Sequence, residues 1–312
     1  MGLPLPLWFK RLKRKRTSAF KPVILVTGCA SGIGLAIAEL LYSDPRYRVV
    51  ATARAGSLAK LRERFKENDR FWIRELDVIN DWHRRELIRE ISEKWEGVNI
   101  LVNNAGISYR AVLEHMSEQN EQHQMATNYF GPVALIRLVL PYMRFVGRGK
   151  IINVSSVSGM LAMPTMASYS ASKYALEGVS EALWYETKPL GINVSLIQPG
   201  FIRSNSFMNV YYTEASKPIP GSTSAYADYY ENMVPFVERL MGLSPTRPHD
   251  VAKIVLNVIR TEDPPLWVPA TYDATIFYYV RRLVPRRFLL PLLFMALPGA
   301  RKWGTGYSKR RE

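Results

Sequence analysis

Residues 22–42 read PVILVTGCASGIGLAIAELLY, and this stretch decides the fold. Its first seven residues, 22–28, are mostly apolar and β-branched and end at a glycine, which predicts a buried parallel strand. Apolar residues recur at helical spacing from 31 to 42, so we expect a helix directly after the turn. A strand, a glycine-rich turn and a helix in this order open a unit of two parallel strands joined by a helix.

The same alternation continues along the chain. We expect further strands at 48–53, 71–78, 99–103, 150–155 and 193–198, and helices at 58–65, 82–95, 118–143 and 169–186. Asp81 is the expected N-cap of the helix that ends at Trp95. Strands that alternate with helices predict an α/β fold with a single doubly wound parallel sheet. Residues 205–245 break the rhythm with Tyr, Met, Pro and Ser, which predicts a substrate-lid insertion or, alternatively, a packed peripheral subdomain.

Composition and charge exclude several classes of protein. The chain has 312 residues, 47% of them hydrophobic, which suffices for one large domain with a sizeable core. The lone Cys29 excludes an internal disulfide framework, and four scattered histidines lack metal-ligand spacing, so we expect no metal. Of the net charge of +15, residues 1–22 carry +7 and residues 281–312 carry +8, while the body between them is neutral. Such basic ends indicate contact with an anionic surface, and the large aliphatic residues among the charges favour lipid over nucleic acid.

We therefore expect three parts: a basic N-terminal tail (1–21), a central domain (22–274) and a basic, apolar, amphipathic C-terminal extension (275–312). Trp8 and Phe9 beside the basic block suit an interfacial anchor, although a solvated tail fits the same residues. The longest uncharged run of the extension, 288–300, has thirteen residues. A membrane span needs about 20 residues, so this run is expected to lie in a membrane interface. An oligomer contact or a cover over the substrate cleft is the alternative.

The turn after the first strand has the composition of a dinucleotide-binding loop. Gly28 suits a tight turn, and Gly32 and Gly34 lack the Cβ that would collide with a pyrophosphate. Ser31 and Ile33 lie between these glycines, where the N-terminus of a helix presents its N–H groups to the ligand. NAD-binding folds place Asp or Glu after the second strand, whereas this chain has Arg54, which can pair with a 2′-phosphate. We expect NADP(H) as the preferred cofactor, with NAD(H) as the alternative.

The segment YSASK, 169–173, contains a pair of residues suited to proton transfer. Tyr169 and Lys173 are four residues apart, so on a helix the phenol and the ammonium lie on one face. A free tyrosine has a pKa of about 10, and an adjacent ammonium favours the phenolate and lowers that pKa toward neutrality. Ser156 lies thirteen residues before Tyr169, just past a strand end, where a loop can turn its hydroxyl toward the same point.

Seven segments of this chain, in order and spacing, resemble the short-chain dehydrogenase/reductase family. They are TGCASGIG (27–34), ELDV (75–78), NNAG (103–106), TNYFG (127–131), NVSSVSG (153–159), YSASK (169–173) and QPGFIRS (198–204). The resemblance covers about residues 22–265, and VVATAR and YSASKYALEG are similar to the hydroxysteroid and retinol dehydrogenase branch. It implies a Rossmann-type domain that binds NADP and carries the catalytic residues.

The resemblance also implies a role for each matching residue. Tyr169 would be the general acid in reduction, Lys173 would lower its pKa and hold the nicotinamide ribose, and Ser156 would bind the substrate oxygen. Asn128 would support a water relay that returns protons to Lys173. The other matching positions would line the cofactor: Asp77 and Val78 at the adenine, Asn104, Ala105 and Gly106 on the adenosine ribose side, and Pro199, Gly200, Ile202 and Ser204 at the nicotinamide. The family often has Thr where this chain has Ser204.

Together these features predict NADPH-dependent reduction of a ketone or aldehyde on a lipophilic substrate such as a steroid, a retinoid or a long-chain keto-lipid. The reverse reaction is alcohol oxidation. The alternative is a non-catalytic NADP(H)-binding redox sensor at a membrane surface. The basic, apolar ends predict a cytoplasmic protein, peripheral on the cytoplasmic face of a membrane. The resemblance implies a homo-oligomer, a dimer or tetramer formed through the helices near 118–143 and 169–186.

Overall fold

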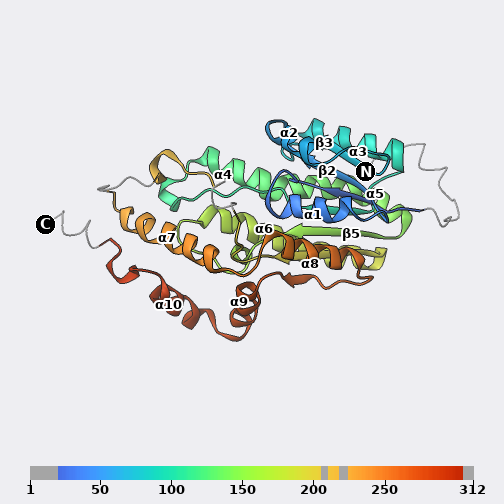
Figure 1. Cartoon of the computed structure of the whole chain (residues 1–312). Coiled ribbons are helices and arrows are strands. Elements are labelled where there is room, and N and C mark those ends of the chain that lie inside the picture. The colour runs from blue at the N-terminus through green and yellow to red at the C-terminus, as the bar shows by residue number, and fades with distance from the viewer. Residues whose placement is uncertain (1–19, 205–209, 218–223, 305–312) are drawn as a thin grey trace.

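The computed structural model describes residues 20–204, 210–217 and 224–304. Within these residues seven parallel strands form one sheet in the order β3-β2-β1-β4-β5-β6-β7 (Figure 1). The strands are β1 (Val23–Val26), β2 (Arg48–Ala53), β3 (Phe71–Glu75), β4 (Ile100–Asn103), β5 (Gly149–Val154), β6 (Ile192–Gln198) and β7 (Trp267–Pro269). Because β1 pairs with both β2 and β4, the strand order reverses there and a crevice opens at the carboxyl edge. The predicted doubly wound parallel sheet is confirmed.

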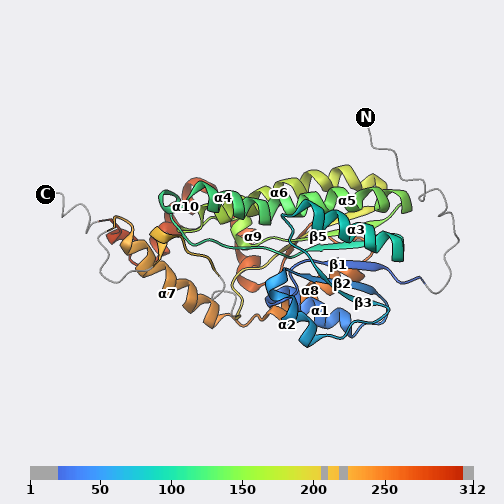
Figure 2. The same ribbon diagram turned by 90° about the horizontal axis from the view of Figure 1, so that it is seen from above.

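Helices cover both faces of the sheet (Figure 2). One face carries α1 (Gly32–Tyr42), α2 (Ala55–Arg64) and α8 (Pro248–Arg260). The other carries α3 (Asp81–Trp95), α5 (Gly131–Val146) and α6 (Ala167–Thr187). Each layer turns one apolar stripe toward the strands, and fully buried side chains such as Ile37 on α1 and Leu135 on α5 fill the space between.

The helix predicted over 118–143 contains a π-helical turn. It begins as α4 (Glu118–Met125), passes through the π turn η3 (Ala126–Phe130) and continues as α5. The Gly131 N–H bonds to the carbonyl of Ala126, five residues earlier, and Pro132 occupies the first turn of α5, where its missing N–H does no harm. By length and hydropathy the whole helix, residues 118–146, is able to cross a membrane, but its apolar side packs on the sheet.

Several predicted boundaries differ from the structure, and for two of them the side chains show the reason. The N-cap of α3 is Asn80, whose side chain accepts a hydrogen bond from the His83 N–H at 3.1 Å. The predicted cap, Asp81, is instead the first helical residue, where its negative charge suits the N-terminus. The strand predicted over 71–78 ends at Glu75, because Asp77 accepts a hydrogen bond from the Ile79 N–H and forms a turn.

The chain beyond β6 adds elements that the sequence analysis did not predict. Strand β7 extends the sheet beyond β6, and helix α8 packs beside α1 on one face of the sheet. Within the expected lid, α7 (Ala227–Leu243) is a long helix, and Tyr211 forms an isolated bridge with Tyr109. Residues 205–209 and 218–223 of that lid, and Trp8 and Phe9 of the N-terminal tail, lie outside the described residues.

Two further helices, α9 (Tyr272–Leu283) and α10 (Arg286–Ala296), follow β7. In Figure 1 α9 lies below the middle of the molecule, and α10 lies below α7. The boundary expected between residues 274 and 275 falls inside α9, and Ala274 packs in a small buried cluster with Val157 and Met160. The first turn of α9 is therefore packed against the loop after β5.

Candidate active site

A pocket of about 430 Å³ lies at the carboxyl edge of the sheet, around the ends of β1, β4 and β5. Most of the residues that the sequence singled out line it. They are Gly28, Ser31, Gly32, Ile33, Arg54, Asp77, Val78, Asn104, Ala105, Gly106, Ser156, Tyr169, Lys173, Pro199, Gly200, Ile202 and Ser204. Gly34 and Asn128 are not among the lining residues, but both contact segments that line the pocket.

Each of the three glycines after β1 is required or favoured for a different structural reason. Gly28 has a φ of +72°, and a Cβ there would lie 2.9 Å from the Ala105 Cα, so this turn requires glycine. Gly32 has a φ of +57° and faces open space, which leaves room for a ligand. The structure gives Gly34 a role other than the predicted clearance of a pyrophosphate. A Cβ at Gly34 would lie 2.1 Å from the Gly28 carbonyl oxygen and 2.4 Å from Asn104 Nδ2, so its absence lets α1 pack against the turn.

This turn fits the pyrophosphate of a dinucleotide. In the described chain Ser31, the N-cap of α1, makes no side-chain hydrogen bond to the first helical turn, and that turn has no acidic residue. The first N–H groups of α1 therefore remain available to an anion at the positive end of the helix dipole. Asn104 holds the turn in place, since its Nδ2 donates to the carbonyl oxygens of Thr27 and Gly28 at 2.9 and 3.0 Å.

Arg54 lines the pocket directly after β2. Its guanidinium donates a hydrogen bond of 3.4 Å to the hydroxyl of Tyr211, and this bond raises the pKa of Arg54. Tyr211 belongs to the segment after β6, so it spans the crevice from the opposite half of the sheet. The cation thus lies where the sequence analysis expects the 2′-phosphate of NADP(H).

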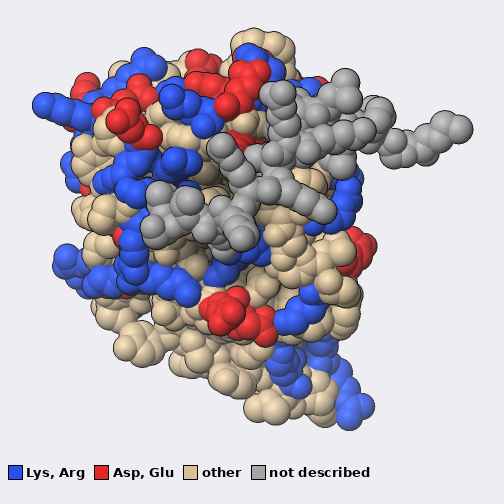
Figure 3. Space-filling view, turned by 90° about the vertical axis from the view of Figure 1, so that its right-hand side faces the viewer, with Lys and Arg blue, Asp and Glu red and all other residues tan. Residues whose placement is uncertain are grey.

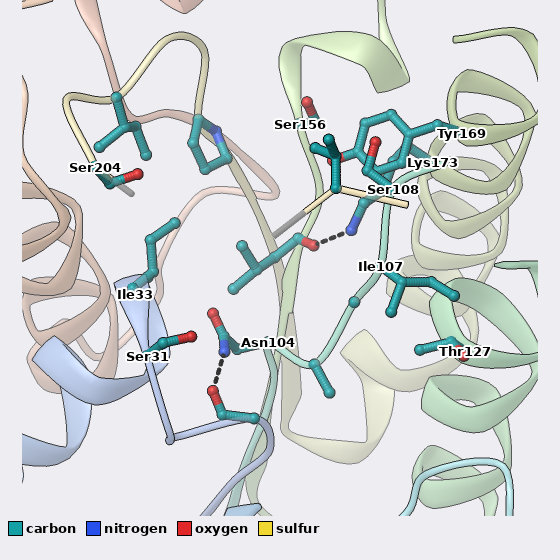
Figure 4. Close-up of a pocket in the computed structure, with 18 of the residues that line it drawn as sticks. Ser31, Ile33, Asn104, Ile107, Ser108, Thr127, Ser156, Tyr169, Lys173 and Ser204 are labelled. Atoms are coloured by element: carbon teal, nitrogen blue, oxygen red, sulfur yellow. Dashed lines mark hydrogen bonds between the residues drawn. The ribbon is translucent and has the colours of Figure 1, made fainter. Parts of the chain in front are cut away.

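Ser156, Tyr169 and Lys173 gather at one end of the pocket, and Ser31, Ile33 and Ser204 lie across from them (Figure 4). Tyr169 and Lys173 share one face of α6, with the Lys173 Nζ 5.8 Å from the centre of the Tyr169 ring. The buried Nζ also donates to the carbonyl oxygen of Val154 at 2.9 Å, which anchors it to the end of β5. Two hydroxyls can therefore reach one substrate oxygen with an ammonium behind them.

Ser155 and Ser156 point to different partners. The Ser155 hydroxyl donates to Glu177 Oε1 at 2.7 Å, and Gln198 Nε2 donates to the same oxygen at 2.9 Å. Burial raises the pKa of the Glu177 carboxyl against the opposing effect of these two hydrogen bonds. Ser156 instead accepts a bond from the Ser158 N–H at 3.1 Å and keeps its own hydroxyl proton for the pocket.

Asn128 braces the site from the π turn η3. Its Oδ1 accepts from the Ile107 N–H and its Nδ2 donates to the Ile107 carbonyl, both at 2.9 Å. The same Nδ2 lies 3.0 Å from the Ser172 hydroxyl, next to Lys173 on α6. One buried amide therefore fixes the loop after β4 relative to the catalytic helix.

The loop after β6 is fastened by the start of α9. The Gly200 N–H donates to the Thr271 hydroxyl and the Phe201 N–H donates to Asp273 Oδ2, both at 2.9 Å. A Cβ at Gly200 would lie 1.9 Å from that carboxylate oxygen, so the close approach needs glycine. Residues expected at the nicotinamide thus depend on a helix beyond the last strand.

Two pocket residues with titratable side chains, Arg110 and His123, were not predicted from the sequence. Arg110 follows β4 in an irregular loop, so no periodic pattern marks it. A cation soon after the carboxyl end of a strand was the available signal, because ligands bind at that edge in α/β sheets.

Known proteins share this sequence and fold. A family described as short chain dehydrogenase matches residues 22–215. The chain is 32% identical over 281 residues to a 3-ketodihydrosphingosine reductase of Bacteroides thetaiotaomicron, which covers 83% of this chain and 98% of that protein. It is 34% identical over 251 residues to retinol dehydrogenase 8 of Bos taurus, covering 78% of this chain and 79% of that one. Among solved structures, a short-chain dehydrogenase from Streptomyces avermitilis has a TM-score of 0.73 and 30% identity, covering 89% of this chain and 98% of that one.

Proposed function

The chain belongs to the short-chain dehydrogenase/reductase family of NAD(P)-dependent oxidoreductases, and we propose that it reduces a ketone or aldehyde on a lipophilic substrate with NADPH. The observation that carries this proposal is the gathering of Ser156, Tyr169 and Lys173 at one end of a pocket (Figure 4). The same pocket extends to the glycine turn after β1. Run in reverse, the site oxidises an alcohol.

The side chains divide the chemistry of reduction among them. A bound nicotinamide cofactor supplies the hydride for the carbonyl carbon. Tyr169 donates its phenolic proton to the carbonyl oxygen, so the carbonyl gains one hydride and one proton and becomes an alcohol. Ser156 donates a hydrogen bond to that oxygen and stabilises the charge that develops on it. Lys173 stabilises the phenolate that Tyr169 leaves behind.

Tyr169 must then regain its proton. We assign this return to Lys173, whose ammonium lies beside the phenol, with Asn128 supporting water that reaches the ammonium. The two hydrogen bonds between Asn128 and Ile107, and its bond with Ser172, support this role because they hold the adjoining backbone still.

A preference for NADPH over NADH rests on Arg54. Arg54 is exposed directly after β2 and lines the pocket. Its guanidinium can form charge-assisted hydrogen bonds with the 2′-phosphate of NADPH, which NADH lacks. Among the described residues that line the pocket, the only carboxylate is Asp77. It lies after the neighbouring strand β3, where we expect the adenine.

A lipophilic substrate is supported by the wall around Tyr169. Apolar side chains that line the pocket include Met163, Met166, Phe201, Val237 and Met241. Two of the relatives are named for a sphingoid ketone and for retinol, which are both lipophilic. Apolar walls with few polar groups are typical of sites for such ligands.

A membrane-bound location is supported by α9 and α10. Large apolar side chains on them face solvent, among them Leu283 at 77% and Leu290 at 61% exposure. Four arginines lie on or beside the same helices: Arg281, Arg282, Arg286 and Arg287. In the sequence from 272 to 304 the only acidic residue is Asp273. In the lowest part of Figure 3, blue and tan side chains appear without red ones. This combination fits the cytoplasmic face of an anionic membrane.

The activity is tested by incubating the full chain with NADPH and a panel of lipophilic ketones and aldehydes, or with a lipid extract. We expect NADPH consumption matched by alcohol products in mass spectrometry. Tight NADPH binding with no turnover of any of these carbonyls would instead favour the redox sensor.

The membrane location is tested by cosedimentation with anionic vesicles. We expect the double variant Leu283→Asp with Leu290→Asp to lose at least about 10-fold in vesicle binding. A leucine side chain that moves from water into the membrane contributes roughly 1.5–3 kcal/mol to binding. Trp82→Asp is the matched control, since Trp82 is 68% exposed on α3, away from α9 and α10 (Figure 1). Equal vesicle binding by the double variant, or stronger binding to duplex DNA at physiological salt, would contradict this location.

A further inference from the structure

Three segments of the chain must be held in register for the proposed site to work. Tyr169 and Lys173 lie on α6, and Ser156 lies in the loop after β5. Pro199 and Gly200, which also line the pocket, follow β6. Ser156, Tyr169 and Lys173 meet at one end of the pocket (Figure 4), although no single element carries all three. Their relative position therefore depends on contacts between α6 and the ends of these strands.

Three polar side chains on one face of α6 bind the end of β5: Lys173, Glu177 and Ser180. They follow one another at spacings of four and three residues, which places them on the same side of the helix. The Lys173 Nζ donates to the Val154 carbonyl oxygen at 2.9 Å, and the Ser155 hydroxyl donates to Glu177 Oε1 at 2.7 Å. Asn153 Nδ2 donates to the Ser180 hydroxyl at 2.8 Å. These bonds fix the end of β5 against the catalytic helix.

Glu177 also binds the end of β6. Gln198 Nε2 donates to the same Oε1 at 2.9 Å. Ser155 directly precedes Ser156 in the sequence, and Gln198 directly precedes Pro199. One carboxyl oxygen on α6 therefore holds both strand ends at the point where the chain enters the pocket wall.

The loop after β5 closes around this carboxyl. A Cβ at Gly159 would lie 2.4 Å from Glu177 Oε1, so glycine lets the loop pass this close. The Gly159 N–H donates to the Ser156 carbonyl at 2.9 Å, and the Val157 N–H donates to the Pro199 carbonyl at 2.7 Å. The backbone of Ser156 thus belongs to a turn that packs against Glu177 and is tied to the loop after β6.

Glu177 is partly buried and is not among the described residues that line the pocket, so it does not meet the substrate. We propose that Glu177 is a positioning residue that sets Ser156 against Tyr169. It acts through Ser155 and Gln198, whose strand ends it holds against α6. The inference rests on the proposed reductase function and adds to it a side chain behind the pocket wall.

The test replaces Glu177 by Leu and by Gln and measures single-turnover reduction of the best ketone by NADPH. Leucine is similar in size but accepts no hydrogen bond, so the two strand ends lose their shared anchor. We expect the rate to fall by about 10- to 100-fold in Glu177→Leu, since a shift of about 1 Å at reacting groups has an effect of this size. Glutamine offers a carbonyl oxygen with the same reach, so Glu177→Gln should keep most of the wild-type rate. The Kd for NADPH should be the same in all variants.

A double variant shows whether Glu177 acts through Ser155. Ser155→Ala alone should lower the rate, because it removes the same hydrogen bond from the side of the strand. Added to Glu177→Leu it should lower the rate no further, since that bond is already absent. Glu181→Leu is the matched control and should keep the wild-type rate, because Glu181 is exposed one turn further along α6.

Hydrogen–deuterium exchange tests the same contacts without a substrate. In the NADP⁺ complex, peptides that cover residues 155–160 and 198–202 should exchange faster in Glu177→Leu than in wild type, and at the wild-type rate in Glu177→Gln and Glu181→Leu. If the wild-type chain reduces no ketone or aldehyde, the proposed reductase function fails, while this measurement still decides whether Glu177 holds the two loops. Unchanged exchange in Glu177→Leu would end the proposal.

Three kinetic results would also overturn the inference. One is a folded Glu177→Leu variant that reduces the ketone at the wild-type rate. Another is an equal loss in Glu177→Leu and Glu177→Gln with a shifted pH profile, which would assign Glu177 an electrostatic role instead. The third is a loss in the double variant equal to the product of the two single losses. Thermal melting shows whether each variant folds, and if Glu177→Leu does not, Ser155→Ala and Gln198→Leu each remove one of the two bonds and should each slow the reduction.

Discussion

Replacing Arg54 by Asp should shift the cofactor preference of the enzyme from NADPH towards NADH. A hydrogen bond to a charged group contributes about 1.5–3 kcal/mol, and because Arg54 is exposed we take the lower end. That loss corresponds to about 10-fold in kcat/KM for NADPH, since 1.4 kcal/mol is a factor of ten. The new carboxylate also repels a 2′-phosphate and accepts hydrogen bonds from a ribose, which contributes a second factor of about 10. The ratio of kcat/KM for NADPH to that for NADH should therefore fall by about 100-fold.

The assay measures both cofactors with the same saturating ketone, so that substrate binding cancels in the ratio. Arg62→Asp is the control for long-range charge, because Arg62 is an exposed arginine on α2 outside the pocket lining. Tyr211→Phe controls for the lost contact with Tyr211, since it removes only the hydroxyl that Arg54 meets at 3.4 Å. Both controls should keep the wild-type ratio. An unchanged ratio in Arg54→Asp would refute the assignment of Arg54 to the 2′-phosphate.

Two further substitutions test the packing behind the pocket. Gly34→Ala places a Cβ 2.1 Å from the Gly28 carbonyl oxygen, so its Tm should fall by the equivalent of about 1–3 kcal/mol, and a Tm within error of wild type would contradict this contact. Glu177→Gln keeps an uncharged oxygen that Ser155 and Gln198 can donate to, and it removes a buried carboxyl whose pKa is raised above 4.5. The stability that the neutral acid contributes is complete below pH 4.5 and is lost as the pH rises through the raised pKa, so the Tm advantage of Glu177→Gln should grow with pH. A Tm difference that stays constant from pH 4 to neutrality would show that the pKa of Glu177 is the same in the folded and the unfolded chain, and would contradict the raised pKa.

The sequence was sufficient for the fold where the hydrophobic period was clear. Strand β2 matches the predicted range at both ends, because its β-branched run is bounded by charged residues. Helix α8 was missed although Val251, Val255 and Ile259 recur at helical spacing after Pro248, and these residues are buried in the core. The pattern that predicts this helix is therefore present in the sequence.

Strand β7 had no comparable signal. It is three residues long and only partly buried, and Pro269 is its last residue. It lies at the edge of the sheet because it pairs with β6, and the amino-acid composition of so short a segment does not predict that pairing. The π turn before α5 likewise depends on packing around Gly131, where a Cβ would lie 2.8 Å from the Val78 carbonyl oxygen.

In the site, too, residues within one local sequence motif could be predicted, whereas residues placed by contacts between distant segments could not. Residues within segments of fixed spacing, such as Tyr169 and Lys173, are visible because one helix brings them together. Arg110 comes to the pocket only through pairing of its loop with residues after β5 and β6. Contacts between segments distant in sequence, such as Asp273 with Phe201, require the folded sheet to be known first.

The central claim is that the phenol of Tyr169 transfers the proton beside a bound NADPH. Its most direct test is single-turnover reduction of the best ketone by Tyr169→Phe, together with the Kd for NADPH from fluorescence titration. We expect the reduction rate to fall by about 10²–10⁴-fold, the usual contribution of a general acid, while the Kd stays at the wild-type value. A Tyr169→Phe variant that reduces the ketone at the wild-type rate would contradict the account.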